Sequence, residues 1–170
     1  MIPISVCIIA KNEEKYIGEC LKRLSRYDWE IIVADTGSFD RTVEIARRYT
    51  PHVFHFDWIN DFSAAKNFAV SRASNDYILT VDCDEYLETD SSTSRILRHL
   101  YRHSAPGQVG MIKRLNPSTP LPGIDAPPPG TGTSPSMVHD RAARFFNRKY
   151  ARYEGIVHEQ LVPVTDTPLT

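Results

Sequence analysis

The sequence predicts an α/β fold built on a mostly parallel sheet, and two observations carry that prediction. Apolar segments of strand length alternate with segments of helical period over residues 1–90. Two of the strand segments, residues 4–10 and 29–34, form apolar runs, which is typical of strands covered on both faces. Helices are therefore expected to flank both faces of the sheet.

In the first half of the chain, predicted strands and helices alternate strictly. The strands are expected at residues 4–10, 29–34, 52–56 and 77–81. The helices are expected at residues 16–24, at residues 39–50 and after Asp61. In the last of these helices, Phe62, Ala65 and Ala69 recur at helical spacing and are expected to face the core.

The second half is predicted to contain one helix and a smaller mixed β region. The helix is expected at residues 91–103, and the strands at residues 109–115, 137–146 and 153–161. Residues 116–136 are rich in proline and glycine and lack any period, so they are expected to form a long loop. One domain is predicted over residues 1–161, followed by a tail or a truncated linker at residues 162–170.

Composition excludes some partners. The 20 basic and 21 acidic residues give a net charge of −1, so no basic surface is expected and nucleic acid is not an expected partner. Cys7 and Cys20 fall at apolar positions, where buried free thiols and a reducing, cytoplasmic compartment are expected. No signal peptide and no membrane-spanning run is present in these residues. Segments outside them are expected to allow association with the inner face of the membrane.

Polar residues follow the first two predicted strands, where a parallel sheet binds its ligands. Asp35 ends the second strand and is expected to contact a ligand. Ser38 is expected to cap the next helix, and Asp40 to lie in its first turn, so both are explained by the strand-to-helix connection alone. Glu13 follows the first strand, where an acid at a helix start explains it as well as a ligand contact does.

Asp82-Cys83-Asp84 follows the fourth predicted strand and is the most informative motif. In an extended chain, Asp82 and Asp84 point to the same side, and two neighbouring carboxylates repel unless a hard cation or a basic group neutralises them. A cation there can also bridge the oxygens of a diphosphate and stabilise its departure. The alternative is an acidic loop at a strand end.

Three further residues are candidates for chemistry. His158 and Glu159 are adjacent, so that one of them can complete a metal shell while the other removes a proton from an acceptor hydroxyl. Lys66 lies on the helix after Asp61, where it can meet a phosphate or pair with a strand-end aspartate. Solvation at the surface is the alternative for Lys66.

These motifs resemble those of the family 2 glycosyltransferases, which are inverting enzymes of the GT-A fold. The matching segments lie in the family's order at residues 4–13, 33–42, 65–67 and 79–85. Residues 56–63 and the late Val157-His158-Glu159 segment resemble a bacterial subgroup whose members often continue into further helical or repeat segments. Cell-envelope polysaccharide is the expected context of the reaction. The resemblance implies a donor-binding half at residues 1–90 and an acceptor-side half at residues 91–161.

The resemblance also implies roles for the donor-side residues. Asn12, Glu13 and Asp35 would bind the uridine part of a nucleotide-sugar. Lys66 would lie near the donor, and Asp82 near its ribose and the metal.

The same resemblance implies a metal site and, less directly, a base. Asp84, with Asp82 and His158, would hold Mn²⁺ or Mg²⁺. Many relatives carry the catalytic base in a Glu-Asp motif, which does not follow residue 85 here. Glu159 is therefore the expected base, with His158 beside it in the catalytic pair.

The expected reaction moves a sugar, with inversion, from a UDP-sugar to a hydroxyl of a glycan, lipid-linked or protein acceptor. One alternative is a nucleotide-sugar-binding module that is inactive without further segments. Another is a nucleotidyltransferase, but such enzymes carry a glycine-rich basic loop after the first strand, and Lys11-Asn12-Glu13 has no glycine.

Overall fold

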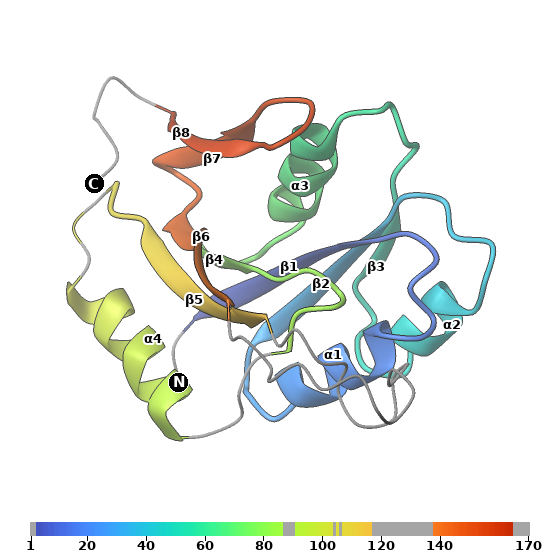
Figure 1. Ribbon diagram of the computed structural model, residues 1–170, viewed down its shortest axis with the longest axis horizontal. Helices are drawn as coiled ribbons and strands as arrows, with labels where there is room; N and C mark the ends of the chain where they lie inside the picture. Colours follow the sequence, from blue (N-terminus) through green and yellow to red (C-terminus); the bar gives the residue numbers. More distant parts are fainter. Residues whose placement is uncertain (1–2, 87–90, 104, 106, 117–137, 165–170) are drawn as a thin grey trace.

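The computed structural model describes residues 3–86, 91–103, 105, 107–116 and 138–164. These residues form a six-stranded sheet in the order β3-β2-β1-β4-β6-β5 and a two-stranded sheet of β7 and β8 (Figure 1). The strands are β1 (Ile4–Ala10), β2 (Glu30–Asp35), β3 (Val53–His55), β4 (Tyr77–Thr80), β5 (Gly110–Asn116), β6 (Val138–Asn147), β7 (Ala151–Glu154) and β8 (Gln160–Pro163). The helices are α1 (Ile17–Leu24), α2 (Thr42–Ala46), α3 (Phe62–Ser71) and α4 (Ser91–His103).

The first four strands are parallel, as the apolar runs predicted. β1 lies at their centre and pairs with β2 and β4, while β3 pairs with β2. Val6, Ile8 and Ile32 are fully buried, because the central strands are covered on both faces. The predicted fold class is confirmed.

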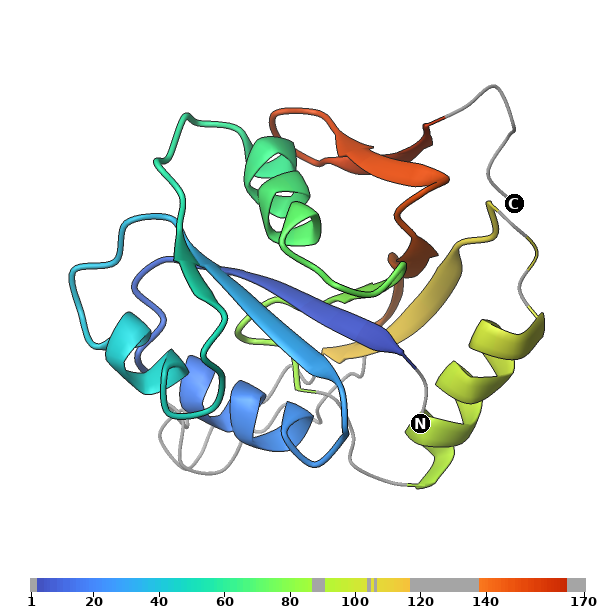
Figure 2. The ribbon, with the colours of Figure 1, turned by 180° about the vertical axis from the view of Figure 1, so that it is seen from behind.

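The helices form a layer on each face of the sheet. α1 and α2 lie on one face and α3 lies on the other (Figures 1 and 2). Ile17 and Leu21 of α1 belong to the core on the first face, and Ala69 and Val70 of α3 belong to the core on the second. The carboxyl ends of the parallel strands therefore open between two helical layers.

Two antiparallel strands complete the large sheet beside β4. β6 pairs with β4, and β5 pairs with β6. Phe145 and Phe146 are adjacent on β6 and are buried in the cores on opposite faces, which is the alternation expected of a strand. β6 thus brings the C-terminal half of the chain against the end of β4.

The predicted strand at residues 153–161 is wrong. β7 ends at Glu154, the backbone turns, and β8 returns antiparallel from Gln160, so the segment is a hairpin. Gly155 has a φ of 109° and His158 a φ of 57°, and these left-handed conformations interrupt the extended chain. His158 and Glu159 therefore lie in a loop, which we call the hairpin loop (residues 155–159).

Other boundaries differ in smaller ways. α2 is shorter than the predicted helix at residues 39–50. Ala65 and Ala69 face the core as predicted, but Phe62 is 40% exposed because it begins α3 at the mouth of a cavity. Residues 162–163 belong to β8 rather than to a tail, and the predicted loop at 116–136, apart from Asn116, lies outside the described residues. Among the described residues, no helix is long and apolar enough to cross a membrane.

Candidate functional site

The loops that follow β1 and β2 are joined by hydrogen bonds at the carboxyl edge of the sheet. Asn12 adopts a φ of 57° and donates its backbone N–H to Ser38 Oγ over 2.9 Å. In return, the backbone N–H of Phe39 donates to Asn12 Oδ1 over 2.8 Å. Ser38 therefore links two loops and does not cap α2, so the predicted capping role of Ser38 is wrong.

Asp35 is buried at the end of β2 and organises its own loop. Its carboxylate accepts the backbone N–H groups of Gly37 and Ser38, each over 3.2 Å. Gly37 has a φ of 97°, so it supplies the tight turn that the sequence predicts. His55 Nδ1 lies 3.8 Å from Asp35 Oδ2. Asp35 thus has a structural role at this edge, and its contact with a ligand remains a prediction.

Glu13 lies near three aspartates at this edge of the sheet. Its backbone N–H donates to Thr42 Oγ1 over 2.7 Å. Partial burial raises the pKa of the Glu13 carboxyl, and the charges of Asp84, Asp40 and Asp82 raise it further. The loops after β1, β2 and β4 therefore concentrate negative charge, which favours a cation.

The Asp82-Cys83-Asp84 segment forms a turn, so the predicted alternation of an extended chain is wrong. The backbone N–H of Glu85 donates to the carbonyl of Asp82 over 2.9 Å and closes this turn. Asp84 is exposed, whereas the Asp82 carboxylate contacts two cationic side chains. The two carboxylates are thus in different environments.

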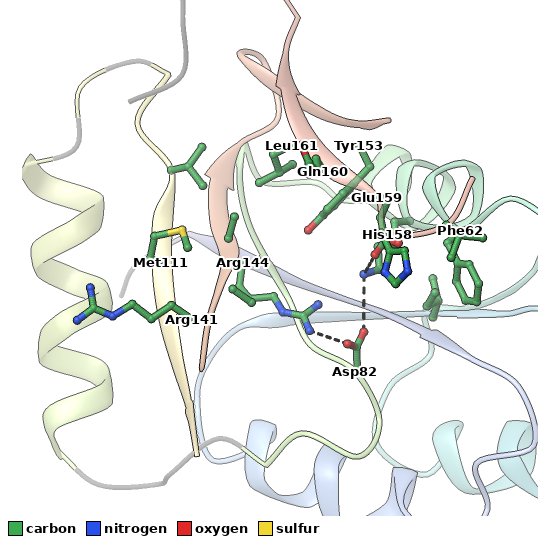
Figure 3. Close-up of a pocket in the computed structure, with 16 residues that line it drawn as sticks. Phe62, Asp82, Met111, Arg141, Arg144, Tyr153, His158, Glu159, Gln160 and Leu161 are labelled. Atoms are coloured by element: carbon green, nitrogen blue, oxygen red, sulfur yellow. Dashed lines mark hydrogen bonds and ion pairs between the residues drawn. The ribbon is translucent and has the colours of Figure 1, made fainter. Parts of the chain in front are cut away.

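Arg144 of β6 is the functional-site residue that sequence reasoning missed. Its Nη2 lies 2.6 Å from Asp82 Oδ2 (Figure 3). The same Nη2 lies 2.6 Å from Glu85 Oε1. Its side chain is only 8% exposed. Burial alone would lower the pKa of Arg144, but the Asp82 and Glu85 carboxylates raise it above its usual range. The available signal was a charged residue inside the otherwise apolar segment at residues 142–146.

Lys66 connects the two halves of the chain. Its Nζ forms an ion pair with Glu159 of the hairpin loop and lies 3.9 Å from Asp82 Oδ1. The side chains of Lys66 and Glu159 are 9% and 15% exposed, so surface solvation does not describe this lysine. The predicted pairing with a strand-end aspartate is observed, together with a partner 93 positions away in sequence.

A cavity of about 900 Å³ opens beside these charges (Figure 3). Val109, Met111 and Leu161 contribute an apolar lining, while Asp82 and Glu159 contribute charge. His158 also lines this cavity and is exposed. The arrangement can hold a molecule with a polar group near Glu159 and a larger body against the apolar lining.

The predicted metal ligands are not brought together as a ready-made site. Among the described residues, no group of three or more His, Cys, Asp or Glu side chains is arranged to hold a metal ion. Asp82 is already paired with Arg144, whereas Asp84 is accessible. These residues fit a hard cation that takes one or two protein carboxylates and completes its shell with phosphate oxygens, as Mg²⁺ commonly does.

The three cysteines are buried and free. This confirms the expected state of Cys7 and Cys20. Burial raises the pKa of Cys20 to about 12, with smaller contributions from Glu85, Asp84 and Asp82. The thiol of Cys20 therefore stays protonated near neutral pH and is a poor nucleophile.

Comparison with known proteins identifies relatives. Residues 5–125 match the family model described as "Glycosyl transferase family 2". The lipopolysaccharide core biosynthesis glycosyltransferase LpsC of Rhizobium meliloti is 30% identical over 95% of this chain and 58% of its own length. An uncharacterized glycosyltransferase of Rickettsia bellii is 36% identical over 91% of this chain and 49% of its own length. The chain thus spans less than two thirds of these relatives.

Solved structures share the fold. Staphylococcus aureus TarS in complex with UDP-GlcNAc has a TM-score of 0.55 and 24% identity, over 64% of this chain and 34% of that chain. The mannosyltransferase PcManGT of Pyrobaculum calidifontis, with GDP-Man and Mn²⁺, has a TM-score of 0.55 and 20% identity, over 65% and 34%. Glucosyl-3-phosphoglycerate synthase of Mycobacterium tuberculosis, with Mn²⁺ and UDP-Glc, has a TM-score of 0.52 and 21% identity, over 62% and 42%.

Proposed function

Because this chain belongs to glycosyl transferase family 2 and has the GT-A fold, we propose that it transfers a sugar from a UDP-sugar to an acceptor hydroxyl with inversion. The observation that carries the proposal is the pairing of Lys66 with Glu159 beside Asp82, next to a cavity of about 900 Å³. This pairing places a carboxylate and an ammonium at the end of β4. A transfer reaction needs both a base for the acceptor and positive charge near the leaving group.

The donor would occupy the carboxyl edge of the parallel strands. Asn12, Glu13 and Asp35 would bind the nucleoside, since their loops are held together there and carry unused acceptor capacity. Asp82 would lie near the ribose. Structural relatives were solved with UDP-sugars and with GDP-Man. Binding experiments must therefore decide which nucleobase this donor site accepts.

A divalent cation would be held by Asp84 and by Asp82, with His158 within the same part of the proposed site. When bound, Mn²⁺ or Mg²⁺ would supply positive charge to the diphosphate. The raised pKa of Glu13, caused by burial and then by Asp84, Asp40 and Asp82, supports the presence of a cation-attracting edge. Lys66 would add a second positive charge near the leaving diphosphate.

Glu159 would act as the base, with His158 beside it. Its Oε1 contacts Lys66, and among the described residues Oε2 accepts no hydrogen bond. Oε2 would take the proton of the acceptor hydroxyl as the oxygen bonds to the anomeric carbon. The bond from that carbon to the diphosphate would break, and UDP would leave with the electron pair. The proposed acceptor is a glycan, a lipid-linked saccharide or a protein, acted on at the cytoplasmic side of a bacterial membrane.

Calorimetry with UDP, with and without Mn²⁺, tests donor binding. We expect Mn²⁺ to strengthen UDP binding, and Asp84→Ala to remove that dependence. Asp28→Ala is the matched control, because Asp28 is exposed and precedes β2 at the opposite edge of the sheet. Binding of UDP that ignores Mn²⁺, or that survives Asp84→Ala unchanged, would refute the metal role.

The base is tested separately by turnover. We expect Glu159→Gln to lower donor hydrolysis or transfer by about 10²–10⁴-fold while UDP affinity is retained. Glu154→Gln is the matched control, because Glu154 is exposed and lies at the end of β7, just before the hairpin loop. This variant should leave turnover unaltered. Equal turnover in Glu159→Gln and wild type would assign the base elsewhere.

A second candidate is a donor-binding module that needs further segments for turnover. The observation that favours it is the 58% of LpsC that this chain spans. Metal-dependent UDP binding without any hydrolysis or transfer would support this candidate. Turnover by the 170-residue chain would exclude it.

A further inference from the structure

Asn67 of α3 makes a two-point contact with the backbone of β7. Its Oδ1 accepts the N–H of Tyr153 over 2.9 Å, and its Nδ2 donates to the carbonyl of Tyr153 over 2.8 Å. One amide side chain thus satisfies both polar backbone groups of one strand residue. This is the hydrogen-bonding pattern of a neighbouring strand, supplied by a helix.

This contact satisfies backbone groups on the edge of β7 that does not face β8. Among the residues that the structure describes, β7 pairs only with β8, so its other edge has backbone groups that require partners. The ring of Tyr153 is buried, and its hydroxyl lies 2.7 Å from Thr80 Oγ1 of β4. Burial raises the pKa of Tyr153 to about 12, although the Thr80 hydrogen bond lowers it, so the hydroxyl stays protonated at neutral pH. Tyr153 therefore ties β7 to the strand that precedes Asp82.

The same helix also holds the hairpin loop at two other points. The backbone N–H of Phe62, in the first turn of α3, donates to the carbonyl of Ile156 over 3.1 Å. Lys66, the neighbour of Asn67, pairs with Glu159. The backbone contact of Asn67 lies on β7, just before the hairpin loop begins at Gly155.

We propose that Asn67 is a positioning residue for Glu159 and not a donor ligand. It fixes the root of the hairpin so that the Glu159 carboxylate lies beside Lys66 and Asp82. The catalytic part of this inference rests on the proposed function, because it takes Glu159 as the base. Displacements of about 1 Å at a reacting group can cost on the order of 10²-fold in rate.

Two variants of Asn67 separate positioning from donor binding. We expect Asn67→Ala to lower turnover by about 10–100-fold while the Kd for UDP changes by less than about twofold. Asn67→Asp keeps the acceptor for the Tyr153 N–H but sets a carboxylate against the Tyr153 carbonyl. Once protonated, that aspartate can donate to the carbonyl again, so the turnover of Asn67→Asp relative to wild type should rise as pH falls from about 8 to about 5. Asn147→Asp is the matched control, because the amide of Asn147 acts as an acceptor for the Lys149 N–H.

Amide hydrogen exchange gives a readout that does not depend on turnover. In Asn67→Ala, the amides of Tyr153 and of residues 155–159 should exchange faster, while those of β1 and β2 keep wild-type protection. Unchanged exchange at Tyr153 would overturn the inference. So would a loss of UDP affinity as large as the loss of turnover, or a lowered melting temperature with full turnover at lower temperature.

The exchange experiment also separates this inference from the proposed function. Failure of wild type to bind UDP would refute the proposed function, while the exchange of Tyr153 would still decide whether Asn67 fixes the hairpin. If wild type binds UDP without turnover, the exchange pattern and the unchanged UDP affinity decide the inference together.

Discussion

Replacing Arg144 with methionine removes a buried guanidinium that two carboxylates share. Methionine keeps much of the apolar stem, so the main change is the loss of the contacts to Asp82 and Glu85, each at 2.6 Å. A hydrogen bond to a charged group contributes about 1.5–3 kcal/mol when well protected from water. Because the Asp82 and Glu85 side chains are 37% and 23% exposed, we discount each contact to roughly 1 kcal/mol. The expected loss of unfolding free energy is therefore about 2 kcal/mol.

Urea denaturation followed by the fluorescence of Trp29 and Trp58 measures this loss. Arg152→Met is the matched control, since Arg152 Nη2 also lies 2.6 Å from its partner Glu154, but these side chains are 57% and 52% exposed. We expect this control to cost less than about 0.5 kcal/mol. Similar losses in Arg144→Met and Arg152→Met would show that burial does not strengthen the contact, and the reasoning would be refuted.

The remaining predictions concern two glycines and a titratable group. Gly155→Ala and Gly37→Ala should each destabilise by about 1–3 kcal/mol, because φ is 109° and 97°, and each lowers the melting temperature. Gly155→Ala should cost more, since its Cβ would lie 3.3 Å from the Glu159 Cα while nothing lies within 4 Å at Gly37; equal shifts would contradict this reasoning. Burial raises the pKa of Glu30, but hydrogen bonds from Ser5 and from the Ser74 backbone lower it below 4.5 overall. The ionised Glu30 therefore stabilises the fold above about pH 4.5, and this contribution is lost as pH falls through the lowered pKa. Glu30→Gln should lower the free energy of unfolding by about 0.5–1 kcal/mol near pH 7 and leave it unchanged near pH 2. Urea unfolding at both pH values measures this difference.

Some of the site follows from local sequence. Asp35 ends β2, Gly37 supplies the positive φ of the turn, and Asp61 begins α3 by accepting the N–H of Ala64. Each of these depends on residues within a few positions, and the required chemistry is specific to the residue type. The prediction of Lys66 near a strand-end aspartate also succeeded, because α3 follows β3 and packs against the sheet.

Other parts of the site depend on contacts that no local pattern encodes. The Arg144 contact with Asp82 joins residues 62 positions apart and exists because β6 pairs with β4. Glu159 reaches Lys66 because residues 155–159 form a turn between two strands, whereas the apolar pattern of residues 153–161 is equally compatible with one strand. Ser38 was expected as a cap but bonds to Asn12, since the loops after β1 and β2 lie side by side in a parallel sheet.

The sequence by itself determined the α/β class, the order of strand and helix segments along the first half of the chain, and the polar loops at the carboxyl ends of the strands. It did so because burial on both faces imposes apolar runs and helical periods that are visible in a few neighbouring residues. Only the tertiary structure decided that Asp82 is paired with Arg144, that Glu159 lies against Lys66, and that Asn67 fixes the strand before the hairpin loop. These contacts are set by the packing of β6 and β7 against β4 and α3, where charge and hydrogen bonding are satisfied across long sequence separations.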